Sequence, residues 1–154
     1  MLRVLALLRH GLAAGQDADA RLLPEGEAYL RRLGAKLETE GWRPAAILAS
    51  PYARALESAT IVAGTVGCEL RPRTLAELVP EADPEIALEA IIAAAPLAAH
   101  ILVVGHQPLL GLLAQELVGD DPGFSPGTLV EIAREGNGVA RVLRRIGPRD
   151  VPAG

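Results

Sequence analysis

The side chains that could do chemistry in this sequence follow three short runs of apolar residues. Those side chains are Arg9, His10, Arg54 and His106. The runs that precede them are residues 4–8, 45–49 and 101–104. Unbroken apolar runs of this length are typical of parallel strands that are buried on both faces. Because the carboxyl ends of such strands form the ligand-binding edge of an open α/β sheet, we expect these side chains to meet there.

The types of these side chains favour phosphoryl transfer. An arginine can donate hydrogen bonds to two phosphate oxygens at once, which a lysine does less well. One histidine can attack phosphorus and carry the group covalently, while a second donates to an oxygen as charge spreads in the transition state. Taken singly, each residue also fits an ordinary role at a strand end or a helix start. Together at one sheet edge, they indicate a phosphate site.

Composition limits the class of protein. A chain of 154 residues that is 50% hydrophobic suits one domain, expected over residues 1–147, with a short loose tail at 148–154. A net charge of -4 without a basic stripe argues against nucleic acid as a partner. One cysteine and three histidines without ligand spacing predict no metal site, and no cofactor is expected.

The N-terminal apolar run is far shorter than a membrane span or the apolar part of a signal peptide. We therefore expect no membrane partner, and a cytoplasmic location is the default.

Amphipathic segments alternate with the apolar runs and predict the elements that position the site. Helices are expected from Pro24 to before Gly41, from Pro51 to about Val66, from Pro84 to before Pro96, and over 109–117. Residues 68–71 are expected to form an edge strand, 73–81 to be irregular, and 128–134 with 139–146 to form a hairpin. The alternation predicts a three-layer α/β/α sandwich with a mainly parallel central sheet.

Three blocks of the sequence resemble the signature blocks of the histidine phosphatase superfamily, which is also called phosphoglycerate mutase-like. The blocks are Arg9-His10-Gly11, Ser50-Pro51-Tyr52-Ala53-Arg54-Ala55 and Val104-Gly105-His106. They come in the order of the family and span most of the chain. The small size is most similar to the SixA-type phosphohistidine phosphatases, and residues 22–26 resemble the stretch that opens their first helix.

The resemblance implies a role for each residue of the blocks. His10 is then the nucleophile that becomes phosphorylated. Arg9, Arg54 and His106 would form the phosphate pocket, and Gly11 and Gln107 are expected to contact the substrate as well. For His10 to attack, its other ring nitrogen should be held as a donor by a backbone carbonyl near Gly11.

The proton donor is expected in residues 76–80, which resemble the acidic segment of these phosphatases. Glu77 occupies the place of the carboxylic acid that protonates the departing atom and later helps water to attack the phosphoenzyme. Glu81 and Asp83 are nearby alternatives. The ordinary structural role of Glu77 would be that of an exposed loop residue.

Two departures from larger relatives bear on the substrate. Residues 71–101 leave room for about one helix, so the fold is expected to be a minimal form without a helical lid. Residues 12–15 lack the polar side chains that often contact phosphate in mutases. Both favour an open site that accepts a phosphate displayed on another protein.

The leading hypothesis is therefore a protein phosphohistidine phosphatase. A phosphomonoesterase of the same superfamily that acts on small phosphate esters is the alternative. A third hypothesis is a catalytically silent phosphate-binding or adaptor module.

Overall fold

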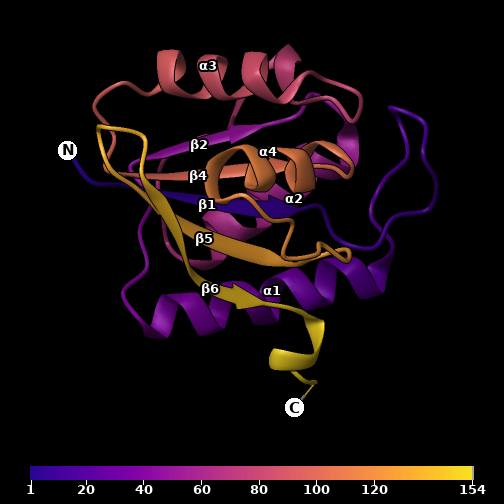
Figure 1. Cartoon of the computed structure of the whole chain (residues 1–154). Helices are drawn as coiled ribbons and strands as arrows, with labels where there is room; N and C mark the ends of the chain where they lie inside the picture. The colour runs from indigo at the N-terminus through magenta and orange to yellow at the C-terminus, as the bar shows by residue number, and fades with distance from the viewer. Residues whose placement is uncertain (154) are drawn as a thin grey trace.

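A sheet of six strands runs through the middle of the molecule, with helices packed on both faces (Figure 1). The computed structural model describes residues 1–153. The strands are β1 (Arg3–Arg9), β2 (Ala46–Ala49), β3 (Arg73–Thr74), β4 (His100–Gly105), β5 (Leu129–Arg134) and β6 (Ala140–Ile146). They lie in the order β3-β2-β4-β1-β5-β6. The first four are parallel, whereas β5 pairs antiparallel with β1 and with β6, so the predicted mainly parallel sheet is confirmed.

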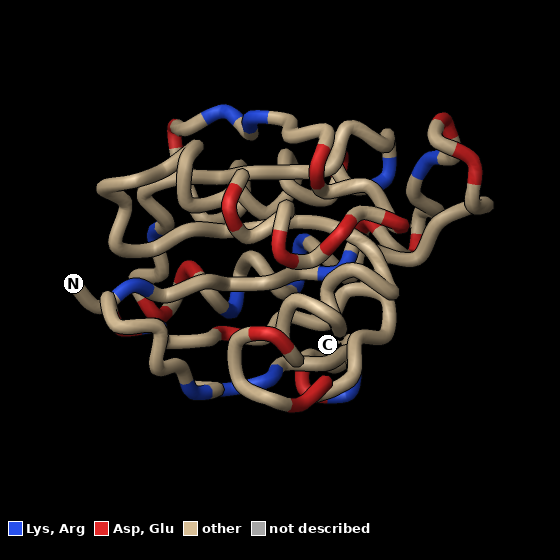
Figure 2. The backbone as a smooth tube through the Cα atoms, turned by 45° about the horizontal axis from the view of Figure 1, so that its top comes forward, with Lys and Arg blue, Asp and Glu red and all other residues tan. Residues whose placement is uncertain are grey.

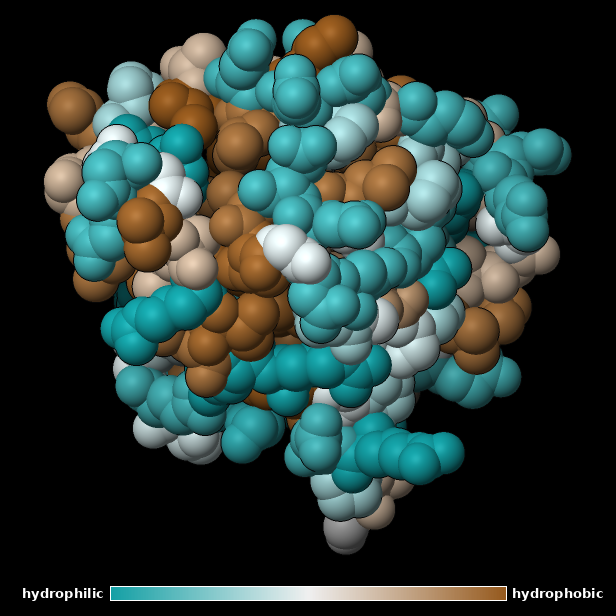
Figure 3. All heavy atoms as spheres, in the orientation of Figure 1, coloured by the Kyte–Doolittle hydropathy of each residue, from teal (hydrophilic) through white to brown (hydrophobic). Residues whose placement is uncertain are grey.

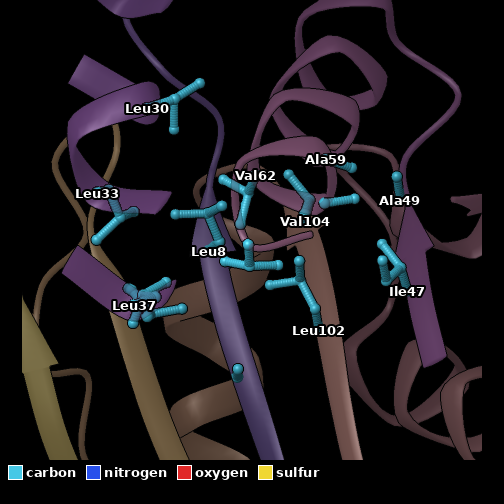
Figure 4. Close-up of a cluster of buried hydrophobic side chains, with 14 of the residues drawn as sticks. Leu8, Leu30, Leu33, Leu37, Ile47, Ala49, Ala59, Val62, Leu102 and Val104 are labelled. Atoms are coloured by element: carbon cyan, nitrogen blue, oxygen red, sulfur yellow. The ribbon is translucent and has the colours of Figure 1, made fainter. Parts of the chain in front are cut away.

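Two pairs of helices form the outer layers. Helices α1 (Pro24–Thr39) and α2 (Ala53–Thr65) cover one face of the sheet, and α3 (Pro84–Ala94) and α4 (Leu109–Val118) cover the other. Alternate residues of β1 point to opposite layers: Leu8 joins the core under α1 and α2, and Leu7 joins the core under α3 and α4. Figure 4 shows the first of these cores. Burial on both faces explains why the central strands are apolar without alternation.

Local sequence explains several helix ends. Proline occupies the first turn of both α1 and α3, where its missing N–H costs nothing. The side chain of Asp83 caps α3 by accepting from the backbone N–H groups of Glu85 and Ile86, at 2.8 and 3.2 Å. Gly119 ends α4 in the left-handed conformation, with φ of 81°.

The edge of the sheet differs from the prediction. Residues 68–71 form no strand, and β3 begins at Arg73, opposite Leu48 of β2. After α2 the chain turns at Gly67, and Cys68 packs against the core with its Sγ 3.9 Å from the carbonyl O of Pro44. The chain therefore pairs with the free edge of β2 only from Arg73 onward.

The end of the chain is also anchored more firmly than predicted. Residues 148–150 form a short 3-10 helix, η2 (Pro148–Asp150), and the Asp150 carboxylate accepts from the N–H of Gly147 at 2.8 Å. Val151 is only 7% exposed and packs into the core under α1. The predicted loose tail is therefore wrong as far as Val151.

Charged and apolar groups are mixed over the outside of the described chain. Figure 2 shows Lys and Arg positions interspersed with Asp and Glu. Some hydrophobic side chains are exposed on the face where α4 and the β5–β6 hairpin lie in front (Figure 3). Leu112 of α4 and Val142 of β6 are among the exposed hydrophobic residues of the molecule. Within residues 1–153, no helix combines the length and apolar character needed to cross a membrane.

Candidate active site

The residues that follow the apolar runs meet at the carboxyl edge of the parallel strands. Strand β1 ends at Arg9 and is followed by His10, β4 is followed by His106, and Arg54 lies in the first turn of the helix after β2. The structure brings all of them to one open cavity of about 530 Å³. The order of the strands explains this, because β2, β4 and β1 are adjacent and parallel.

His10 is held in the tautomer that a nucleophile requires. Its Nδ1 lies 2.7 Å from the carbonyl O of Gly11, and because a carbonyl only accepts, Nδ1 carries the proton. Nε2 keeps its lone pair and accepts from Nε of Arg54 at 3.3 Å. Burial lowers the pKa of His10 to about 4, although the hydrogen bond to Gly11 opposes this and the Arg54 and Arg9 charges reinforce it. The ring is therefore neutral near pH 7, and the predicted contact with a carbonyl at Gly11 is confirmed.

Arg54 is fixed by the loop that precedes α1. Its Nη1 donates to the carbonyl O of Asp17 at 2.7 Å, and its Nη2 donates to the carbonyl O of Gln16 at 3.2 Å. The N–H of Ala53 also donates to the carbonyl O of Ala18, at 2.9 Å. The far end of the guanidinium is thus held by backbone, while its Nε edge faces the nucleophile.

Arg9 approaches the cavity from the end of β1. Its Nη1 donates to the carbonyl O of Phe124 at 2.8 Å. Its Nε is buried and has no hydrogen-bond partner within residues 1–153. Burial and the nearby Arg54 charge lower the pKa of Arg9.

His106 lies beside His10, with 5.1 Å between the ring centroids. It is 1% exposed, and burial lowers its pKa to about 3, with His10, Arg54 and Arg9 acting in the same direction. Its Nε2 lies 2.8 Å from Oγ of Ser50. Ser50 is fully buried at the end of β2, and its Oγ also accepts from the N–H of Tyr52 at 3.2 Å.

A second serine ties the nucleophile loop to α2. Oγ of Ser58 accepts from the N–H of Gly11 at 3.0 Å and donates to the carbonyl O of Arg54 at 2.7 Å. Both polar backbone groups of Gly11 are therefore used inside the protein, and Gly11 is absent from the residues that line the cavity. Gly11 orients His10 in this structure, and its contact with the substrate stays a prediction.

Ser50 opens the second signature block, but neither serine was assigned a role from the sequence. Both stand close to Arg54, and the signal that could have found them is their polarity beside buried apolar positions.

The acidic segment places its carboxylates differently from the prediction. Glu77 lies on a 3-10 helix, η1 (Ala76–Leu78), whose Leu78 is fully buried, so Glu77 is turned to the exposed side. Glu77 does not line the cavity, so its role as the proton donor stays a prediction that the structure does not support. Glu81, one of the two alternatives, does line the cavity, whereas the other, Asp83, is engaged in capping α3.

Gln107 lines the cavity and also supports the helix behind it. Its Oε1 accepts from the N–H of Gly111 at 2.7 Å, which leaves its amide nitrogen for another partner.

Helix α3 packs against α4 on the sheet face, so none of residues 71–101 forms a helix over the cavity. Within residues 1–153, no three His, Cys, Asp or Glu side chains are grouped to hold a metal ion.

Comparison with known proteins agrees with this geometry. Residues 5–79 match the sequence model of the histidine phosphatase superfamily (branch 1). The part of the chain that carries Arg9, His10 and Arg54 is therefore similar to that superfamily. No curated protein matches the chain.

Several solved structures share the fold over nearly the whole chain. The protein histidine phosphatase SixA complexed with tungstate is 23% identical, with a TM-score of 0.89 over 97% of this chain and 99% of that chain. A protein from Nakamurella multipartitia that is described as a putative phosphohistidine phosphatase SixA is 25% identical, with a TM-score of 0.77 over 96% of this chain and 97% of that chain. A phosphoglycerate mutase from Bacillus anthracis is 16% identical, with a TM-score of 0.77 over 92% of this chain and 91% of that chain. These likenesses establish the phosphoglycerate mutase-like fold.

Proposed function

We propose that this protein is a phosphatase that works through a covalent phosphohistidine at His10, and that its substrate is phosphohistidine in another protein. One observation carries the proposal. Nε2 of His10 is unprotonated and faces the cavity edge of Arg54, while Nδ1 is held by Gly11. Such a ring is ready to attack an anion that the arginines hold.

The phosphate would lie between Arg9, Arg54 and His106. The lone pair of Nε2 of His10 attacks phosphorus, and the bond from phosphorus to the substrate atom breaks with its electron pair on the leaving group. His10 becomes a cation that still donates from Nδ1 to Gly11. The two guanidinium groups stabilise the charge on the oxygens in the transition state.

Water completes the reaction. It attacks phosphorus, the bond to Nε2 breaks, and the electron pair returns to the ring as inorganic phosphate leaves. Neutral His106, packed beside His10, is suited to hydrogen-bond a phosphate oxygen in both steps. Glu81 is the carboxylate at the cavity wall that can move protons to and from the leaving group and the water.

The character of the site supports phosphohistidine over an ordinary ester. An alkoxide leaving group needs a proton donor, whereas an imidazole already protonated on its other nitrogen leaves without one. Glu81 is exposed, and the cavity is open, which suits a phosphate carried on a protein surface.

Substrate profiling tests the proposal. Purified protein should release phosphate from a phosphohistidine-bearing domain faster than from sugar, nucleotide or aryl phosphates, and rapid quench should trap an acid-labile, base-stable phosphate on His10. His10→Ala should abolish turnover. A clear preference for a small ester would favour the phosphomonoesterase. Failure to turn over any substrate, with no trapped phosphoenzyme, would favour a silent phosphate-binding module.

A further inference from the structure

A second cavity, of about 320 Å³, borders the candidate active site near the start of α1. It is lined by Leu12, Glu25, Gly26, Tyr29, Arg32, Ser125, Pro126 and Pro148. Leu12 and Pro126 also line the active-site cavity, so the two hollows adjoin each other. We call this second hollow the flanking cavity.

The flanking cavity is connected to the nucleophile through backbone. The segment that carries Pro126 continues into Gly127, whose N–H lies 3.1 Å from the carbonyl O of Arg9 and 3.0 Å from that of His10. Gly127 has φ of 84°, and the Tyr29 ring packs so closely on it that a Cβ there would meet ring carbons at 2.5 Å. A single strip of chain therefore forms a wall of both hollows.

The opposite wall is equally well fixed. The carbonyl O of Leu12 accepts from the N–H of Leu23 at 2.9 Å. Gly26 of α1 packs on the Leu12 backbone so closely that a Cβ would lie 2.3 Å from the Leu12 carbonyl O. The cavity is therefore preformed, and a ligand would not have to order it.

The lining indicates what the flanking cavity can hold. The Leu12 side chain is 48% exposed at the border between the hollows, and Tyr29 and two prolines add apolar surface. One acidic and one basic residue, Glu25 and Arg32, leave no excess of either charge. An apolar group of modest size fits this lining better than a second phosphate does.

We infer that the flanking cavity binds an apolar side chain of the substrate polypeptide, close in sequence to its phosphorylated histidine. The inference rests on the proposed function. An extended substrate chain that places phosphohistidine in the active site carries its next side chains on the same face about 7 Å away. One of them can pass the Leu12 border and enter the flanking cavity. A phosphate ester without such an extension reaches only the active site.

Two sets of substrates test this inference. The first is a pair of phosphohistidine peptides that differ only in leucine or serine two residues to either side of the phosphohistidine. The second is phosphoramidate, which carries no flanking group. The wild-type protein should prefer the leucine peptide about tenfold in kcat/KM, since burying a leucine side chain is worth at least that factor.

Blocking variants provide the decisive comparison. Glu25→Trp and Ser125→Trp fill the flanking cavity from two sides, and both residues are exposed, so folding should tolerate them. Each should remove the preference for leucine by raising KM, while turnover of phosphoramidate stays unchanged. Glu38→Trp, on the same helix at an exposed position away from the cavity, is the matched control and should keep the preference.

The outcomes separate the two proposals. Turnover of phosphoramidate without any preference for leucine, or a preference that survives both blocking variants, would overturn the flanking cavity and leave the proposed function standing. Equal losses on peptide and phosphoramidate in the folded blocking variants would also overturn it. A wild-type protein that turns over neither substrate would refute the proposed function and this inference together.

Discussion

The two buried histidines of the site should make folding stability depend steeply on pH. Burial lowers the pKa of His10 to about 4 and that of His106 to about 3, whereas an unfolded histidine has a pKa near 6.5. Below pH 6.5 these two histidines therefore bind protons in the unfolded chain but not in the folded chain. Stability is complete above that pH and is lost as the pH falls toward the folded values.

The size of the effect follows from the two pKa values. At pH 5 each histidine should lower the free energy of unfolding by about 2 kcal/mol relative to pH 7.5, or about 4 kcal/mol together. Both side chains are less than a tenth exposed, so screening by water removes little of this. His100, whose pKa burial also lowers, contributes in the same direction in every variant.

Urea unfolding at pH 7.5, 6.5, 5.5 and 5.0 measures the effect in the wild type, His10→Asn and His106→Asn. Between pH 7.5 and 5.0, the free energy of unfolding should fall by about 2 kcal/mol less in each variant than in the wild type, whatever the substitution does to stability at pH 7.5. The comparison within each protein cancels the cost of the substitution itself. Equal losses in all three proteins would show that the histidines are not held neutral by burial, and would contradict a neutral His10 as the nucleophile.

Three further substitutions test the parts of the site. Arg54→Ala should weaken vanadate binding about tenfold or more by calorimetry, because a charged hydrogen-bond donor is lost, whereas Arg21→Ala, an exposed arginine paired with Glu57, should not. Ser50→Ala should lower kcat with little change in KM, because Nε2 of His106 loses its partner; an unchanged kcat would contradict that role. Glu81→Gln should slow hydrolysis of aryl phosphates far more than that of phosphohistidine, and equal effects of Glu81→Gln and Glu77→Gln would argue against the assignment.

The alternation of strands and helices could be predicted from the sequence because local signals agree with the fold. Apolar runs became β1, β2 and β4, and the proline starts of α1 and α3 stand where expected. The meeting of Arg9, Arg54 and His106 follows from the same signals, because residues after parallel strands share one edge. Only the order of the strands, in which β2, β4 and β1 are neighbours, depends on pairing between distant segments of the chain.

The errors lie where contacts between distant segments decide the result. The orientation of η1 depends on which of its residues the core buries. Leu78 is fully buried, so Glu77 faces away from the core. The loop carbonyls that hold Arg54 come from Gln16 and Asp17. Because every residue has a backbone carbonyl, no sequence pattern predicts which of them will accept these hydrogen bonds. His100 packs against Trp42, with ring centroids 4.8 Å apart, and no motif around His100 predicts this contact.

The site combines two requirements that oppose each other, and the fold resolves the conflict through burial. Arginine charges must be present to bind phosphate, yet the nucleophile between them must stay neutral to attack. The neighbouring charges alone would favour a neutral histidine only weakly in water, because solvent screens them. Burial adds the larger effect for both histidines, and the carbonyl of Gly11 then selects which nitrogen of His10 keeps its lone pair. The acid sensitivity of folding is thus a direct consequence of the arrangement that makes His10 a nucleophile.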